Sequence, residues 1–298
     1  MNQPTYLWLP FFAAVFYAVG ALYYKQGFKN GAGLMRTFFI NNWFLAFGFI
    51  PLAFIDGFDR PWGDVWQPIL VGTLFFFGHL FTFLGIRVSD VSLVTPILGT
   101  KTIFVALTSS LYLHDKGLPA GMWAAAFMTA IAIFILGWSS LKPGEIISKG
   151  VIYTIISASF FGICDTLVAR WAKDFGVFGF NAVMFLVAAL YSFGLIPFFK
   201  APLSKMGKKA TKSICLGAIW TTIQAMLMGI SIGFFNNPTG VNVVYSSRGL
   251  WALIIVWFLG QYFTNSEKKS SGRGWILRVT GTLIMTGAVL LAIFASQK

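Results

Sequence analysis

Acidic residues are scarce in this chain of 298 residues, which has nine Asp and Glu against 22 Lys and Arg. Charged residues of either sign make up 10% of the sequence, whereas hydrophobic residues make up 57%. This balance excludes an ordinary soluble globular protein and is typical of a polytopic membrane protein. The net charge of +13 therefore has a topological explanation, and no nucleic-acid partner is expected.

Cysteine and histidine are equally scarce, with two residues of each type. Cys164 and Cys215 lie in apolar surroundings, so they are interpreted as small core residues rather than as a disulfide framework. His79 and His114 stand alone, without the spacing of metal ligands. No glycine-rich phosphate loop or nucleophile elbow occurs. The sequence therefore predicts no enzyme activity, no catalytic residues and no metal or other cofactor.

Apolar runs as long as a membrane-spanning helix recur along the chain, with short polar breaks between them. Ten spans are predicted, at 5–24, 35–55, 67–85, 91–113, 119–138, 149–171, 178–199, 213–235, 241–263 and 274–295. The turn sequence Lys-Pro-Gly-Glu at 142–145 marks the centre, so five spans precede it and five follow. The predicted fold class is an all-α integral membrane protein with ten transmembrane helices.

The two halves of the chain resemble each other in sequence. Lys101 and Arg248, 147 positions apart, each lie inside a predicted span, and Phe-Gly-Phe-Ile-Pro at 47–51 aligns with Phe-Gly-Leu-Ile-Pro at 193–197. Five helices per half make the second copy enter the membrane from the opposite side, which is an inverted repeat. We therefore expect two five-helix repeats as domains, 1–141 and 149–298.

Most lysines and arginines fall in the loops after the odd-numbered spans, above all in 200–212 and 268–278. The positive-inside rule puts these loops in the cytoplasm and both termini outside. Binding of anionic lipid headgroups is the alternative interpretation of the same basic runs. The expected location is a bacterial inner (cell) membrane, with the chain as a monomer or homodimer in the lipid bilayer.

Two basic residues lie where a cation is costly. Lys101 stands about 15 Å into the span 91–113, at a rise of ~1.5 Å per residue. A cation near the midplane costs about 2.5–3.5 kcal/mol on insertion scales and so indicates a functional site, with snorkelling or pairing with a carboxylate as the alternative. Arg248 repeats this feature, and only Asp165 among the acidic residues is clearly within a span. One carboxylate cannot neutralise both cations, so an anionic or zwitterionic substrate is favoured.

Further polar residues at membrane depth are predicted to complete the substrate site. Tyr245 precedes Arg248 by three positions and therefore shares its helical face. Asp165 and His79 are candidates for proton coupling or an ion pair, although His79 also fits a packing role. The remaining predicted substrate-binding residues are Asn41, Asn42, Gln224 and Tyr17. The amides among them would equally suit hydrogen bonding between helices.

Ten spans, a five-plus-five repeat and short loops resemble the drug/metabolite transporter superfamily, and its EamA-like transporters in particular. The likeness is carried by Asp-Val-Ser-Leu-Val-Thr-Pro-Ile-Leu at 90–98, running to Leu-His-Asp-Lys at 113–116. Family members commonly have Glu at the end of helix 4, where this chain has Asp115, and Tyr262 occupies the matching place in the second half. The resemblance implies a metabolite transporter and leaves its substrate open. The two cations are also similar in position to those with which sugar-phosphate translocators of this superfamily hold phosphate.

Together these features predict a secondary active transporter that moves a small organic anion or zwitterionic metabolite by alternating access. Lys101 and Arg248 would bind the negative group, and exchange as an antiporter, in metabolite export, is the expected mode. One alternative is a proton-coupled exporter of amino acids or drug-like metabolites. Others are a flippase for lipid-linked phosphates and a membrane scaffold or receptor that transports nothing.

Overall fold

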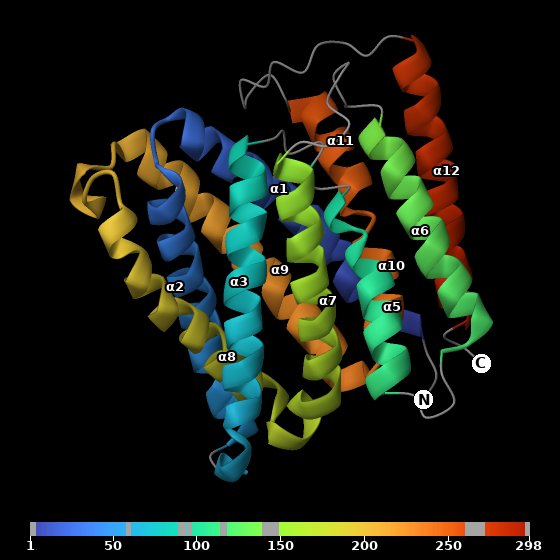
Figure 1. Cartoon of the computed structure of the whole chain (residues 1–298), viewed down its shortest axis with the longest axis horizontal. Coiled ribbons are helices and arrows are strands. Elements are labelled where there is room, and N and C mark those ends of the chain that lie inside the picture. Colours follow the sequence, from blue (N-terminus) through green and yellow to red (C-terminus); the bar gives the residue numbers. More distant parts are fainter. Residues whose placement is uncertain are drawn as a thin grey trace.

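The computed structural model describes residues 4–57, 61–88, 94, 97–113, 118–138, 149–259 and 272–295, and these residues contain helices but no β-strand. The helices stand side by side in one bundle (Figure 1). They are α1 (Trp8–Lys29), α2 (Leu34–Ala53), α3 (Trp66–Val88), α5 (Lys101–Tyr112), α6 (Ala120–Trp138), α7 (Lys149–Phe175), α8 (Val177–Ser192), α9 (Lys208–Phe235), α10 (Pro238–Tyr245), α11 (Arg248–Leu259) and α12 (Gly272–Ala295).

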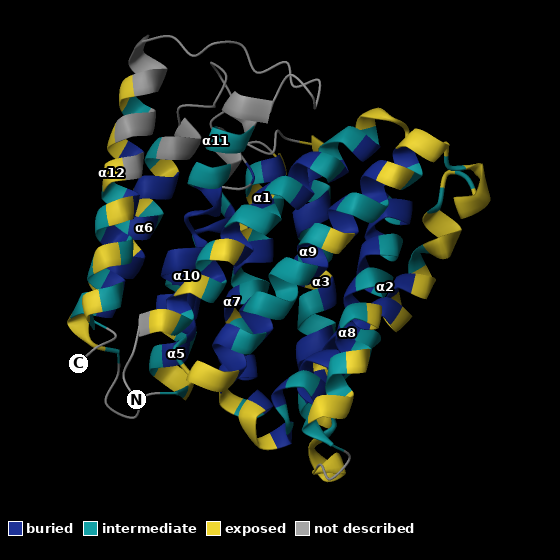
Figure 2. Cartoon of the chain, turned by 180° about the vertical axis from the view of Figure 1, so that it is seen from behind, coloured by how far each residue is buried: buried dark blue, intermediate teal, exposed yellow. Residues whose placement is uncertain are grey.

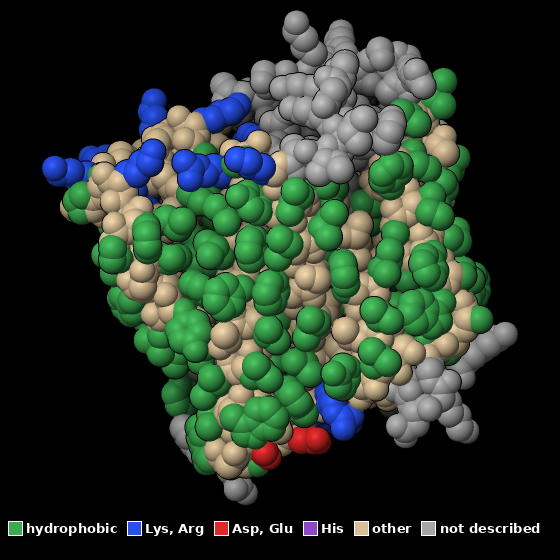
Figure 3. All heavy atoms as spheres, viewed as in Figure 1, with side chains coloured by type: hydrophobic (Ala, Val, Ile, Leu, Met, Phe, Trp, Pro, Cys, Tyr) green, Lys and Arg blue, Asp and Glu red, His purple; other side chains and the backbone are tan. Residues whose placement is uncertain are grey.

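Six helical segments in the described ranges are long and apolar enough to cross a membrane. They are Thr5–Lys29, Leu34–Asp56, Trp62–Val88, Lys149–Phe175, Val177–Phe198 and Lys208–Phe235, with shorter apolar helices at Ala120–Ile135 and Leu283–Ala295. Hydrophobic side chains cover the flank of the bundle, while most of the lysines and arginines in view gather at one end (Figure 3). The protein is therefore a multi-pass integral membrane protein whose outer surface suits lipid.

The spans 91–113 and 241–263 are predicted as continuous helices, but the structure interrupts both of them. A two-residue turn at 99–100 precedes α5, and a second turn at 246–247 divides α10 from α11. Residues 91–93, 95–96 and 260–263 of these spans lie outside the described residues. Both turns lie near the middle of the bundle, because α5 and α10 occupy one half of its length and α11 the other (Figure 1).

A hydroxyl side chain bonds to a preceding carbonyl at each of these two breaks. Thr100 Oγ donates to the carbonyl of Ile97 at 2.8 Å, and Ser246 Oγ donates to the carbonyl of Asn242 at 2.8 Å. Such bonds offer the backbone a partner other than the next helical turn. The same carbonyls also accept from the backbone N–H groups of Thr100, at 3.0 Å, and Ser246, at 2.9 Å. Carbonyl groups beside both breaks therefore keep hydrogen-bond partners in the membrane interior.

Pairs of helices from opposite halves of the chain run along each other: α1 along α9, α3 along α7, α2 along α8 and α6 along α12. Glycine permits the closest of these approaches. A Cβ on Gly20 of α1 would stand 2.7 Å from Thr221 Cγ and 3.2 Å from the carbonyl oxygen of Gly217 on α9. Small residues of this kind are how membrane helices reach van der Waals contact without a hydrophobic driving force between them.

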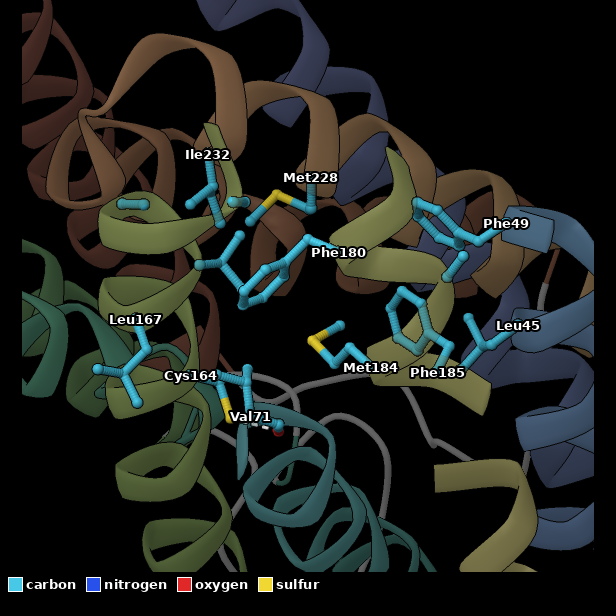
Figure 4. Close-up of a cluster of buried hydrophobic side chains, with 14 of the residues drawn as sticks. Leu45, Phe49, Val71, Cys164, Leu167, Phe180, Met184, Phe185, Met228 and Ile232 are labelled. Carbon is cyan, nitrogen blue, oxygen red and sulfur yellow. Dashed lines mark hydrogen bonds between the residues drawn. The ribbon is translucent and has the colours of Figure 1, made fainter. Parts of the chain in front are cut away.

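The buried side chains lie at the centre of the bundle and the exposed ones on its outer faces and ends (Figure 2). A large apolar cluster joins α1, α2, α3, α7, α8, α9 and α10, and part of it is drawn in Figure 4. It includes Leu45, Phe49, Val71, Cys164, Leu167, Phe180, Met184, Phe185, Met228 and Ile232. Helices of both halves therefore contribute to this cluster, and several of its residues also line a cavity between the halves.

Candidate functional site

A cavity of about 130 Å³ lies between helices of both halves of the chain. Its wall takes side chains from α1, α2, α3, α7, α8 and α9, together with the first residues of α5 and α11 and the last residue of α10. Part of the wall is aromatic and is supplied by Phe75, Phe83, Phe161 and Phe185. An apolar cavity with a few polar groups from different helices is typical of a small-molecule site.

Lys101 meets a carboxylate inside this cavity. Its ammonium lies 2.6 Å from Asp165 on α7, and the lysine is 6% exposed. Asn242 on α10 donates to the same carboxylate oxygen at 2.6 Å and to the carbonyl of Pro238 at 2.8 Å. The lysine ammonium also lies 5.5 Å from the ring centre of Phe161. Lys101 is thus paired within the bundle and does not snorkel to the surface.

Arg248 is buried beside the same cavity but has a different environment. Its guanidinium carbon lies 4.3 Å from the ring centre of Tyr245 and 5.0 Å from that of Tyr17. The residue is 4% exposed, its Nε has no hydrogen-bond partner, and no ion pair joins it to a carboxylate of the described chain. The two rings stabilise the cation through their faces. They leave the Nε–H without an acceptor of its own.

The two broken helices bring their positive ends to this place. Lys101 and Arg248 are the first residues of α5 and α11, so both helix dipoles add positive potential at the cavity. Both cations reach one ring, because the Lys101 ammonium lies 5.8 Å and the Arg248 guanidinium 4.3 Å from the centre of Tyr245. Discontinuous helices whose N-termini point at an anionic group recur in secondary transporters.

A second polar cluster joins α1, α2, α3 and α9 in another part of the cavity wall. Asn41 Oδ1 accepts from the hydroxyls of Tyr24 and Thr221, the latter at 2.8 Å. The amide nitrogen of Asn41 lies 3.1 Å from His79 Nε2, and His79 Nδ1 lies 3.0 Å from Asn42 Oδ1. Both ring nitrogens of His79 therefore have partners, and the cluster ties four helices together.

Most of the predicted site residues meet at this one cavity, lined by Tyr17, Asn41, His79, Lys101, Asp165, Gln224, Tyr245 and Arg248. Asn42 does not line it and reaches the site only through its hydrogen bond to His79. Sequence reasoning missed Asn242, which holds Asp165, and also Tyr24 and Thr221 of the second cluster. The sequence feature that could have indicated Asn242 is its position four residues after Pro238, within the first turn and a half of α10.

No group of three or more His, Cys, Asp or Glu residues in the described chain could hold a metal ion. Cys164 is buried and lines the cavity, and its Sγ contacts the carbonyl oxygen of Val71 at 3.7 Å. Cys215 is partly buried on α9, and both cysteines are free thiols. Asp115 and Tyr262, the residues at the ends of the two predicted spans, lie outside the described residues.

A lipid-facing helical bundle with a charged cavity between its two halves defines a membrane protein of the transporter class. Residues 4–138 match the model of the EamA-like transporter family. The match bears out the resemblance to this family over these residues and is consistent with the drug/metabolite transporter superfamily. The family that this part of the chain matches and the membrane-helix architecture together point to a transporter rather than an enzyme.

A solved structure, described only as the crystal structure of a protein, has the same fold. The similarity covers 97% of this chain and 96% of that chain, with a TM-score of 0.68 and 16% sequence identity. No curated protein matches the sequence. These comparisons leave the substrate to be argued from the cavity itself.

Proposed function

We propose that the protein is a secondary transporter that moves a small organic anion or zwitterionic metabolite across the membrane by alternating access. Arg248 carries this proposal, because it is buried at the cavity without a carboxylate partner in the described chain. A buried, unpaired cation is costly, and a bound anion offsets that cost. The planar guanidinium also fits a carboxylate or phosphate through two parallel hydrogen bonds.

The neighbouring polar groups have subordinate roles in the proposal. Tyr17 and Tyr245 orient the guanidinium, and Lys101, whose ammonium lies 5.8 Å from the centre of the Tyr245 ring, adds positive potential nearby. Asn41 and Gln224 shape the pocket, and Asn42 acts through His79. His79 is better suited to structure than to proton transfer, because Asn41 and Asn42 already occupy both of its nitrogens.

An inverted repeat of ten spans, with domains 1–141 and 149–298, is the architecture in which this mechanism would operate. In such a repeat α1, α2, α3 and α6 correspond to α7, α8, α9 and α12. The helix pairs support this correspondence, because it turns the pair α1–α9 into the pair α7–α3 and leaves the pairs α2–α8 and α6–α12 unchanged. The turns before Lys101 and Arg248 also correspond. Two copies of opposite orientation let one fold open to either side in turn.

The first experiment replaces Arg248 with Gln in the purified protein. A thermal-shift panel of monocarboxylates, dicarboxylates, phosphate esters and amino acids identifies an anion that stabilises the wild type. We expect Arg248→Gln to lower the affinity for that anion at least about tenfold, since a hydrogen bond to a charged group contributes roughly 1.5–3 kcal/mol. Arg87→Gln is the matched control, because Arg87 is exposed at the end of α3.

Equal affinity of Arg248→Gln and wild type for the stabilising anion would contradict the proposed site. The same anion then serves in counterflow with proteoliposomes. Uptake that requires internal substrate supports exchange, because an empty cavity with an unpaired cation reorients slowly. Uptake that a pH gradient alone accelerates supports proton coupling through Asp165 instead.

A further inference from the structure

The charges at the cavity do not balance. Lys101, Arg248 and Asp165 are the Lys, Arg, Asp or Glu side chains that line it in the described chain. Lys101 and Asp165 form an ion pair at 2.6 Å, and this pair sums to zero wherever its shared proton lies. Arg248 remains as a permanent cation, because guanidinium does not lose its proton in proteins.

His79 adds no charge to this count. Asn41 Oδ1 accepts from Tyr24 and Thr221, so the Asn41 amide nitrogen must face His79 Nε2 and donate to it. Nε2 then carries no proton, while Nδ1 donates to Asn42 Oδ1 at 3.0 Å. The imidazole is therefore neutral, and the cavity as described carries a net charge of one positive unit.

Net charge matters more here than in water, because the wall is largely apolar and screens poorly. A ligand with one negative charge leaves the loaded cavity neutral. A zwitterion leaves one positive charge, and a dianion leaves one negative charge beside the Asp165 carboxylate. Desolvation penalises both of these states.

We propose that the substrate carries a net charge of minus one, that Arg248 binds it, and that Asp165 excludes dianions by neutralising Lys101. This inference rests on the proposed transport function and narrows its substrate class. Asp165 is then the residue that determines specificity. Asn242 positions it, since the Asn242 amide donates to the same carboxylate oxygen as Lys101 does.

Ligands of matched shape test the charge rule, by which we mean that the substrate carries a net charge of minus one. The aromatic wall of Phe75, Phe83, Phe161 and Phe185 favours a phenyl group on the probe. The probes are 3-phenylpropanoate, phenylalanine and 2-phenylsuccinate, which carry net charges of minus one, zero and minus two at pH 7.5. The concentration of each probe that gives half the maximal thermal stabilisation is measured on the purified full-length protein.

Wild type is expected to bind 3-phenylpropanoate most tightly of the three. Asp165→Asn leaves both cations unneutralised, so its affinity for 2-phenylsuccinate relative to 3-phenylpropanoate should rise at least tenfold. Lys101→Gln brings the net charge of the cavity to zero, so this variant should bind phenylalanine most tightly of the three probes. Asp174→Asn, an exposed residue on the same helix, is the control and should keep the wild-type order.

The double variant Lys101→Gln with Asp165→Asn restores a single positive charge without the ion pair. Recovery of the preference for 3-phenylpropanoate in this variant supports selection by net charge, and it remains informative where Asp165→Asn alone does not fold. Binding of 3-phenylpropanoate by wild type with the same probe order in all these variants overturns the charge rule and leaves the transport function standing. The charge rule is also overturned if wild type binds none of the three probes while another anion stabilises it through Arg248. If no anion stabilises the wild type, the result counts against both the charge rule and the transport function.

Discussion

Lys101 and Arg248 occupy corresponding places in the chain but meet different neighbours. A carboxylate that also accepts from an amide faces the lysine, whereas two tyrosine rings face the arginine. Guanidinium is more weakly hydrated than ammonium and stacks on aromatic faces, so it tolerates a site without a counterion better than lysine does. The arginine is therefore the cation that can remain without a counterion until an anionic ligand binds.

Replacement of Tyr245 tests this role of the rings. Tyr245→Leu removes the face that lies 4.3 Å from the Arg248 guanidinium and should lower the free energy of unfolding by about 2 kcal/mol, the value of a desolvated cation–π contact. Tyr245→Phe retains the ring and should lose much less. Thermal unfolding of both purified variants measures the difference, and equal losses would show that the hydroxyl matters rather than the ring.

Hydropathy alone located the two cations and Asp165, because an ionisable group in an apolar run is costly and therefore conspicuous. Asn242, Tyr24 and Thr221 escaped notice for the opposite reason. Neutral amides and hydroxyls are common in membrane helices, where they hydrogen-bond to their own backbone or to a neighbouring helix. Their importance comes from the helix that faces them, which a single sequence does not reveal.

At the scale of elements, the position of Lys101 depends on how closely α5 approaches α7. Gly162 of α7 sets this distance: a Cβ there would stand 2.5 Å from Phe104 Cβ and 3.1 Å from the backbone of Phe104 and Val105. Thr108 and Thr166 add a hydroxyl contact of 2.6 Å across the same interface. The ion pair of Lys101 with Asp165 spans these two helices as well.

Gly162→Ala should therefore separate α5 from α7. The backbone atoms of α5 cannot rotate away from the new methyl group, and overpacking of this kind costs about 1–3 kcal/mol. We expect a lower unfolding temperature and weaker binding of the stabilising anion than in wild type. Gly194→Ala is the control, since nothing lies within 4 Å of its Cβ position. Indistinguishable unfolding temperatures of the two variants would contradict this account.

The positions of the long helices were predictable from apolar length, but the interruptions were not. The turns at 99–100 and 246–247 interrupt runs whose hydropathy continues on either side. Gly99 and Gly249 beside hydroxyl residues were the available signal, yet glycine and serine are equally common at packed interfaces between unbroken membrane helices. The hydrogen bonds of Thr100 and Ser246 to preceding carbonyls accompany the two turns. Bonds of the same kind also occur within an unbroken helix, as from Thr166 to Gly162 in α7.

At the scale of the whole molecule, charge is distributed unevenly between the two ends. Exposed lysines at 200 and 205 lie in the segment that joins α8 to α9, and those at 208, 209 and 212 lie in the first turns of α9. The helix α1 begins and α12 ends at the opposite end of the bundle (Figures 1 and 3). The positive-inside rule predicts that the lysine-rich end faces the cytoplasm.

Cysteine labelling in intact cells checks this orientation. The background is Cys164→Ala with Cys215→Ala, to which Ser204→Cys or Gly63→Cys is added at exposed positions of opposite ends. A membrane-impermeant maleimide should label Gly63→Cys and should reach Ser204→Cys only after the cells are broken. Labelling of Ser204→Cys in intact cells would reverse the predicted topology.

The breaks near the middle of the bundle have an electrical consequence. A charge that rests beside α5 and α11 has crossed roughly half of the membrane voltage, whichever water phase it came from. For a monoanion at 100 mV that is about 1.2 kcal/mol, half of the full value per elementary charge. Entry from one side and departure to the other would thus share the voltage almost equally, and polarisation of the membrane would alter apparent affinity on the two faces by similar factors in opposite directions.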